Sequence, residues 1–231
     1  MKNIFIEPLA ANKSESEIIR LFEDFIIAED HPCIMAQAVF NAKNYVLNCY
    51  NDFGSTATAE KLVHDLEKFV ANHDFESNRL ESFIAVFPKR KFYSEMEFEE
   101  ILWQQLIEIN KKDPHDWDTS VSSAPEDKHF SFSIAGRAFF VVGMHPNSSR
   151  IARQSPLPAI AFNLHYQFDN LRERGVFEEV KEKIRKRDKE LQGNINPMVE
   201  DFDKDSEAKQ YSGRAVDNLW KCPFQHPKKN T

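Results

Sequence analysis

Apolar residues recur at helical spacing in several stretches of the chain. The clearest begins at Ser14, where the Ser-x-x-Glu form of a capping box precedes apolar residues at positions 18, 21, 22, 25 and 26. The same spacing predicts further helices over residues 33–40, 56–71, 94–110, 164–175 and 177–191. Gly175 is the glycine expected just beyond a helix end. Helices therefore supply most of the predicted regular structure.

Four other stretches have the patterns of strands, at residues 82–87, 130–134, 138–143 and 159–163. Residues 138–143 form a continuous apolar run, typical of a strand covered on both faces, whereas residues 130–134 alternate Phe and Ser, which predicts a half-buried strand. Gly136 and Arg137 are predicted to form a hairpin turn between these two strands. The strand at 159–163 is expected to run beside 138–143. The predicted fold is α+β, with helices flanking a small, mostly antiparallel sheet.

Composition supports one domain over residues 1–231, with a frayed tail at about 225–231. Apolar residues make up 41% of the 231 residues, including 20 Phe, so the chain can bury a substantial core. No Pro-rich, Gly-rich or highly charged linker divides it. The chain holds six Gly, which favours helices joined by polar loops over an all-β design.

Charge is distributed unevenly along the sequence. The net charge is −7, and Lys plus Arg number 12 against 20 acidic residues in residues 1–115 but 18 against 17 in residues 116–231. Eight of the eleven Arg lie between Arg137 and Arg214. An acidic chain without a strong basic tail is a poor candidate for nucleic-acid binding, whereas a local Arg cluster can hold a carboxylate or phosphate. A small anionic ligand is therefore expected, with no nucleic acid.

Cysteine usage and hydropathy predict a reduced, cytoplasmic location. Cys33, Cys49 and Cys222 are odd in number, widely spaced and without a CxxC pair, which argues against a disulfide framework and a structural zinc site. No apolar run approaches the ~20 residues of a membrane span, and the N-terminus lacks the basic-then-apolar order of a signal peptide. No membrane association is predicted.

Two histidines are the first candidates for site chemistry. His145 follows the apolar run 138–143 in a loop with Pro and Ser, and it could be a metal ligand, a proton carrier or a residue that only caps the loop. His165 follows the strand at 159–163 among apolar residues, and the alternative for it is a hydrogen-bonded core histidine. Because both stand at the ends of predicted neighbouring strands, they could face one pocket.

Arginines and a cysteine add further candidates. Arg150 and Arg153, at spacing i, i+3 beside Ser148 and Ser149, could hold two carboxylates as bidentate contacts, with ordinary salt bridges as the alternative. Cys33 stands at the predicted start of a helix, where backbone N–H groups and the helix dipole favour a thiolate, with a small buried apolar residue as the alternative. The sequence has no Walker loop, GxGxxG, HExxH or GxSxG, so nothing indicates nucleotide hydrolysis or acyl transfer.

The motifs together resemble those of the YqcI/YcgG family, whose studied members are haem-dependent N-oxygenases of guanidino groups. One branch makes N-hydroxyarginine, and another hydroxylates a cyclic guanidine precursor of a cyanobacterial toxin. The matching stretches are His31-Pro32-Cys33, Phe130-Ser131-Phe132-Ser133, Gly136 to Arg153, Phe162 to Phe168, Ile184 to Asp188, Asn196-Pro197-Met198, Ser206 to Arg214 and Trp220 to Phe224. They cover the last hundred residues densely and the first part sparsely. His31 departs from the aromatic residue expected before Pro-Cys.

This resemblance implies an enzyme containing haem b (iron protoporphyrin). It implies an N-hydroxylating monooxygenase that acts on an arginine-like or cyclic guanidino small molecule, with O2 and electrons from an external reductase. By the same resemblance, His145 or His165 is expected as the axial ligand, and Arg150 and Arg153 are expected at the haem propionates. Cys33 is the competing axial ligand, because its predicted place at a helix start favours a thiolate. An Asp or Glu near the haem is expected to pair with the guanidinium.

Two other interpretations belong to different classes. The chain could be a non-catalytic haem-binding or small-anion-binding protein, such as a sensor or carrier. It could also be a structural or interaction protein whose Arg cluster makes only salt bridges. Oxygen-dependent product formation from a guanidine separates the first interpretation from an enzyme, and the absence of haem uptake would indicate the second.

Overall fold

The computed structural model describes residues 13–194, 206–217 and 219–226. Its helices are α1 (Glu15–Glu23), α2 (Ile34–Asn41), α3 (Thr56–Asn72), α4 (Glu95–Lys112), α5 (Tyr166–Glu173), α6 (Phe177–Gln192) and α7 (Ala208–Tyr211), with a π-helical segment η2 (Asp24–Ala28) and a 3-10 turn η3 (Ile151–Arg153). Its strands are β1 (Tyr45–Cys49), β2 (Ser82–Val86), β3 (Phe132–Ile134), β4 (Arg137–Met144) and β5 (Ala159–Leu164). The Asn196-Pro197-Met198 motif and most of the tail predicted at 225–231 lie outside the described residues.

The strands form one open sheet in the order β1-β2-β5-β4-β3. The pair β1 and β2 is parallel, and every other neighbouring pair is antiparallel. This confirms the predicted α+β fold with a mostly antiparallel sheet, and it confirms that β5 runs beside β4. Strand β1 was not predicted, because it is a five-residue edge strand in which only Leu47 is buried.

The β3–β4 hairpin turns one residue earlier than predicted. Ile134 pairs with Arg137, so the two turn residues are Ala135 and Gly136, with φ of 55° and 69°. A two-residue turn with positive φ at both positions matches the right-handed twist of the strands. The prediction of a half-buried Phe and Ser alternation was also wrong, because Phe132, Ser133 and Ile134 are all buried. The Ser133 hydroxyl accepts a hydrogen bond from the Asp118 backbone N–H, so its burial leaves no unpaired oxygen.

Side-chain oxygens fix where several helices begin. Ser14 and Glu17 form the predicted capping box of α1, in which each side chain binds the backbone N–H of the other residue. Ser94 accepts a hydrogen bond from the Glu97 backbone N–H at the start of α4. Both Ser-x-x-Glu signals therefore mark helix starts, as the sequence predicts.

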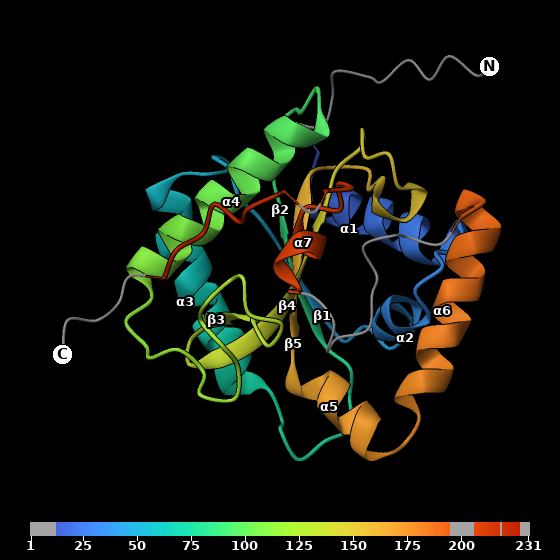
Figure 1. Cartoon of the computed structure of the whole chain (residues 1–231). Helices are drawn as coiled ribbons and strands as arrows, with labels where there is room; N and C mark the ends of the chain where they lie inside the picture. Colours follow the sequence, from blue (N-terminus) through green and yellow to red (C-terminus); the bar gives the residue numbers. More distant parts are fainter. Residues whose placement is uncertain (1–12, 195–205, 218, 227–231) are drawn as a thin grey trace.

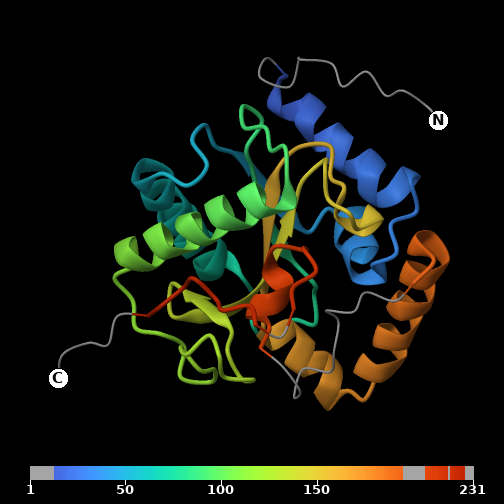
Figure 2. The same cartoon turned by 45° about the horizontal axis from the view of Figure 1, so that its top comes forward.

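Helices cover both faces of the sheet, as Figures 1 and 2 show: α3 and α4 lie on one face, and α1, α2 and α6 lie on the other. Each face has its own core. The face under α3 and α4 carries a large cluster rich in Phe, and the face under α1 and α2 carries a smaller cluster that includes Phe22, Ile84 and Ala159. We call these the α3/α4 face and the α2/α6 face. No helix in the described part of the chain combines the length and apolar character that a membrane crossing requires.

Candidate functional site

A largely apolar cavity of about 350 Å3 lies on the α2/α6 face, between the sheet and helices α2, α5 and α6. Its volume is at the lower end of the roughly 300–1000 Å3 typical of ligand pockets. Strand β5 supplies Ala161 and Asn163 to the floor, while the alternate residues Ile160, Phe162 and Leu164 are buried in the cluster of the other face. Small side chains on one side of β5 therefore leave the space that the cavity occupies.

Helix α6 closes the cavity without burying a side chain completely. Val180 and Ile184 line the cavity from this helix. Polar contacts hold the helix in place: Arg187 forms an ion pair with Asp30 at 2.6 Å, and the Gln192 side chain accepts a hydrogen bond from the Ile151 backbone N–H. A wall with little apolar burial costs less to open than a packed core element.

Cys33 lines the cavity at the start of α2, where it is the N-cap residue. Burial raises the pKa of the Cys33 thiol, although the backbone N–H groups of Ala36 and Met35 act on the sulfur in the opposite direction. The helix start was predicted to favour a thiolate, but desolvation is the larger effect and favours the neutral thiol. A metal ion would reverse this balance, because coordination deprotonates a thiol.

His31, two residues before Cys33, uses both of its ring nitrogens. Its Nδ1 accepts a hydrogen bond from the Cys33 backbone N–H at 3.1 Å, and its Nε2 donates to the Ala152 carbonyl at 2.9 Å. Burial lowers the pKa of His31 to about 4. The ring is therefore neutral, lines the cavity as a fixed wall and offers no free nitrogen to a metal.

The two arginines of the predicted anion clamp do not act together. Arg150 forms an ion pair with Asp188 of α6 and donates to the Asn194 side chain at 2.7 Å, so it fastens α6. Arg153 lines the cavity and donates to the Gly143 carbonyl at 2.9 Å, with a longer contact of 3.5 Å to the Gln210 carbonyl. Within the described residues no carboxylate forms an ion pair with Arg153. Burial lowers the pKa of Arg153 to about 10, so the side chain remains a cation at neutral pH.

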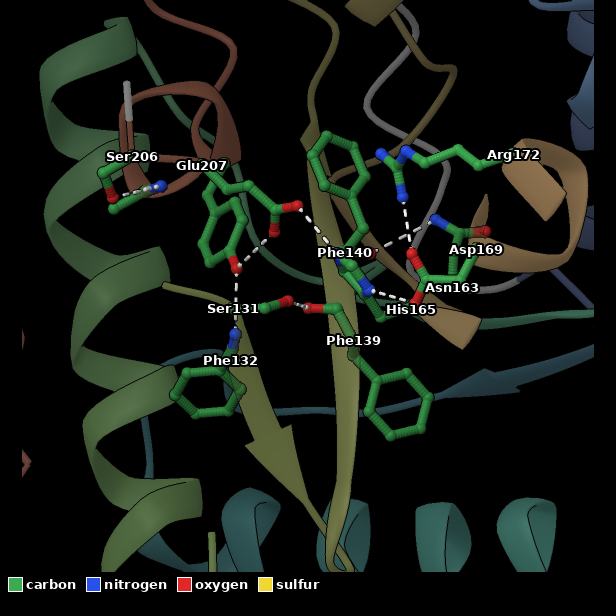
Figure 3. Close-up of polar contacts among 12 residues, drawn as sticks. Ser131, Phe132, Phe139, Phe140, Asn163, His165, Asp169, Arg172, Ser206 and Glu207 are labelled. Carbon is green, nitrogen blue, oxygen red and sulfur yellow. Dashed lines mark hydrogen bonds and ion pairs between the residues drawn. The ribbon is translucent and has the colours of Figure 1, made fainter. Parts of the chain in front are cut away.

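His165 lies at the cavity wall between two carboxylates, with its side chain 7% exposed. Its Nδ1 is 3.2 Å from Asp169 Oδ2, and its Nε2 is 3.3 Å from Glu207 Oε1 (Figure 3). Burial opposes the charged ring, but the two carboxylates outweigh it and raise the pKa of His165 to about 9. The ring is therefore an imidazolium at neutral pH, with an acid facing each nitrogen, which is not the state of a haem ligand.

His145 is on the opposite face of the sheet and does not line the cavity. Its ring stacks on Phe98 with centroids 4.4 Å apart, and neither ring nitrogen has a hydrogen-bond partner among the described residues. The prediction that His145 and His165 share a pocket was wrong. Strands β4 and β5 are antiparallel, so their ends point in opposite directions, and the pleat then turns the two side chains to different faces.

The serines beside His145 are also occupied within the chain. The Ser149 hydroxyl and backbone N–H both donate to Glu95 Oε1 at 2.9 Å, and the Ser148 hydroxyl accepts a hydrogen bond from the Arg150 backbone N–H. The anion that this loop binds is therefore a glutamate of α4.

Two cavity-lining acids were not singled out from the sequence, Glu81 and Glu207. Glu81 immediately precedes β2, and His73 Nδ1 lies 2.7 Å from its Oε2, while His73 Nε2 accepts the Tyr166 hydroxyl. Glu207 is 2% exposed and follows Ser206. The only signal for Glu81 was an acid directly before a buried strand, and for Glu207 an acid within a stretch of matching motifs. Neither signal indicates a shared cavity.

The described residues contain no group of three or more His, Cys, Asp or Glu side chains arranged to hold a metal ion. A site for bound iron on this face would thus rest on a single protein ligand and a cofactor that supplies the rest. Among the predicted ligands, Cys33 and His165 line the cavity, and His165 lies between two acids, which leaves Cys33 as the candidate.

Comparisons with known proteins agree with the extent of this fold. The model of the YqcI/YcgG family matches residues 22–225 of the chain. A protein of Bacillus subtilis (strain 168), described as the uncharacterized protein YqcI, is 25% identical over 207 residues, which cover 85% of this chain and 81% of that protein. No solved structure matches the chain significantly. The family match includes every cavity-lining residue discussed above.

Proposed function

Because the chain belongs to the YqcI/YcgG family, we propose that it is a haem-dependent monooxygenase that hydroxylates a nitrogen of a guanidino small molecule. The observation that carries the proposal is the position of Cys33 at the wall of the apolar cavity. A thiolate is one of the axial ligands that proteins provide to haem iron, and an apolar pocket is what a porphyrin requires.

The residues of the cavity fit haem b in two respects. Cys33 Sγ at the start of α2 faces backbone N–H groups that stabilise negative charge on sulfur. Arg153 is a half-buried cation that forms no ion pair with a carboxylate in the described part of the chain, so it can still accept an anionic partner. A propionate of bound haem would supply that partner. Arg150 would keep its ion pair with Asp188, so the expectation that it binds a propionate is not retained.

Glu81 is our candidate for holding the guanidinium. His73 contacts both Glu81 and the Tyr166 hydroxyl through its two ring nitrogens, and no Lys or Arg in the described residues forms an ion pair with Glu81. The other two cavity acids are paired, Asp188 with Arg150 and Glu207 with His165. Glu81 thus leaves a negative charge at the cavity that a cationic substrate would neutralise.

When bound, haem would supply the activation of O2: with two electrons from an external donor and two protons, one oxygen atom would enter a substrate N–H bond and the other would leave as water. The chain would do the rest. Cys33 and Arg153 would hold the cofactor, the apolar residues of β4 and α6 would exclude water, and Glu81 would orient the substrate nitrogen.

The first test is the absorption spectrum of protein purified with haem available, before and after reduction and addition of carbon monoxide. Wild type is expected to show a Soret band with a thiolate-ligated carbon monoxide complex, and Cys33→Ala is expected to lose that complex. The matched control is Cys49→Ala, because Cys49 is exposed on β1 away from the cavity. A complex that survives in Cys33→Ala but is lost in His145→Ala or His165→Ala would overturn the ligand assignment.

The second test is product formation. Oxygen-dependent hydroxylation of arginine or another guanidine, with reductant supplied, is expected for wild type. Glu81→Gln is expected to raise KM by roughly tenfold to 100-fold, since a hydrogen bond to a charged group contributes about 1.5–3 kcal/mol. Loss of haem from Glu81→Gln would contradict its role at the substrate. Haem binding without turnover on any guanidine would favour the carrier or sensor, and a colourless wild type would overturn the proposal.

A further inference from the structure

A chain of polar side chains runs from the half-exposed end of α5 to the buried C-terminal segment (Figure 3). Arg172 Nη1 lies 2.6 Å from Asp169 Oδ1, and Asp169 Oδ2 lies 3.2 Å from His165 Nδ1. His165 Nε2 then faces Glu207 Oε1 at 3.3 Å, and the Tyr211 hydroxyl donates to Glu207 Oε2 at 3.4 Å. The local sequence brings the first three together, because His165, Asp169 and Arg172 stand at positions i, i+4 and i+7, which share one face of a helix.

The charges along this chain alternate, from Arg172 and Asp169 to His165 and Glu207. The Asp169 side chain is 50% exposed, whereas those of His165 and Glu207 are 7% and 3% exposed. Water therefore reaches one end of the chain, and the other end is at the dry cavity that Cys33 also lines. An imidazolium with an acid on each nitrogen holds a proton that can pass to either acid.

Two features distinguish Glu207 from a purely structural acid. Its contacts to His165 and Tyr211 are 3.3 and 3.4 Å long, whereas Glu99 of α4 receives the Arg214 Nε–H at 2.8 Å and a second bond from Nη2. Glu99 already fastens the same C-terminal segment through Ser212 and Arg214. The segment thus has a stronger attachment elsewhere, and Glu207 faces the cavity as well.

Other titratable groups at the cavity wall are committed to other partners. Asp188 is held by Arg150, Glu81 contacts His73 and is the proposed partner of the substrate, and both nitrogens of His31 are in backbone hydrogen bonds. Among these described groups, the His165 and Glu207 pair is the one that carries an exchangeable proton at the cavity while remaining next to a group in contact with water.

We infer that His165 and Glu207 form the proton donor of the cavity, with Glu207 as the catalytic residue and Asp169 as a positioning residue. This rests on the proposed function. Hydroxylation consumes O2, two electrons from the external donor and two protons: the substrate N–H becomes N–OH, and the second oxygen atom leaves as water. The His165 Nε2 proton passes to Glu207, and Glu207 passes it to that second oxygen. Water at the half-exposed Asp169 end then reprotonates the pair, and a second transfer along the same path supplies the other proton.

Asp169 acts through His165. Its carboxylate faces Nδ1, so it keeps the protonated Nε2 directed at Glu207 and stabilises the charged ring. Arg172 in turn fixes Asp169 from the neighbouring turn of α5. The arrangement differs from a catalytic triad. The resting His165 ring is charged and gives up a proton, whereas the resting histidine of a triad is neutral and accepts one.

The first measurement uses the haem-free protein and needs no activity. Nitrogen NMR of the His165 ring is expected to show both nitrogens protonated at pH 7.5 in wild type, with the proton lost near pH 9. In Glu207→Gln and in Asp169→Asn the proton is expected to be lost at lower pH, because each removes one carboxylate. A neutral His165 ring in wild type at pH 7.5 would overturn the inference.

The second measurement uses the haem-loaded enzyme and compares product with hydrogen peroxide per electron consumed. Glu207→Gln is expected to form at least about tenfold less product per electron while keeping haem and substrate KM, since positioned proton transfer contributes about 10²–10⁴ in rate. Asp169→Asn should also lower the product formed per electron, but by less, because the Asp169 side chain is half exposed. Glu207→Asp should recover part of the product lost in Glu207→Gln.

The matched control is Glu99→Gln, which weakens attachment of the same C-terminal segment without touching the cavity. It is expected to lower stability and leave product per electron unchanged. Equal losses in Glu99→Gln and Glu207→Gln would reduce Glu207 to a structural role. A wild type that forms no product overturns the proposed function and this inference with it, whereas an active wild type with a fully coupled Glu207→Gln overturns this inference alone.

Discussion

The two faces of the sheet are built from the same strands but pack differently. On β5, Ile160, Phe162 and Leu164 fill the α3/α4 face, while Ala161 and Asn163 leave a cavity on the α2/α6 face. The two histidines repeat the contrast: His145 is enclosed by aromatic rings on the filled face, and His165 carries a charge at the wall of the hollow one. One face is therefore responsible for most of the stability, and the other retains the space and the polar groups that chemistry needs.

The sharpest test of this contrast is a pair of identical truncations. Phe162→Ala on the filled face should lower the free energy of unfolding by about 3–5 kcal/mol, because the side chain is fully buried and a cavity remains. Phe140→Ala on the cavity side should cost less than half as much, since Phe140 already borders empty space. Urea unfolding of both variants measures the difference. Equal losses would mean that the two faces are packed alike.

A smaller effect is expected from enlarging two alanines on the same side of β5. Ala159→Leu should cost about 1–3 kcal/mol, because Ala159 is fully buried in the α1/α2 cluster and has no room beside it. Ala161→Leu should cost under about 1 kcal/mol, because the added atoms enter the cavity. It should also reduce haem uptake, which Ala159→Leu should not. Haem titration together with unfolding separates the variants, and normal uptake by Ala161→Leu would place the cofactor elsewhere.

The sequence predicts the framework of this molecule better than its site. Ser14 and Ser94 mark helix starts through bonds that are local in the chain, and the apolar run 138–143 marks a buried strand, so both are predictable. Whether β4 and β5 run parallel or antiparallel depends on long-range pairing. The antiparallel pairing of β4 and β5 is what places His145 and His165 far apart.

The partners of the charged groups could not be predicted from the sequence either. Arg150 and Arg153 are three residues apart, yet one meets Asp188 of α6 and the other meets backbone carbonyls at the cavity. Glu207 and His165 are 42 positions apart, and only folding brings them within 3.3 Å. Cys33 shows the converse: its place at a helix start was predictable, but the desolvation that raises its pKa depends on the cavity around it.

The smallest expected effect concerns His145, and its sign is unusual for a buried residue. Its ring lies between Phe92 and Phe98 with both nitrogens unpartnered among the described residues, and a buried polar atom without a partner costs about 1–3 kcal/mol. His145→Phe should therefore raise the free energy of unfolding by about 1 kcal/mol at pH 7, after allowance for the larger ring. His165→Phe should lower it, because the buried Glu207 would lose the cation beside it, whereas Asp169 would keep Arg172.

The pH dependence of His145→Phe sharpens the same point. Burial lowers the pKa of His145 below its ordinary value of 6.5, so below pH 6.5 the unfolded chain binds a proton that the folded chain does not. Wild-type stability then falls as the pH drops through that range, and the gain from His145→Phe should grow from pH 7 to pH 5. The acid sensitivity due to His31 is common to both proteins and cancels in the difference. A gain that shrinks toward pH 5 would mean that His145 is protonated in the fold and that the filled face, too, contains a charge.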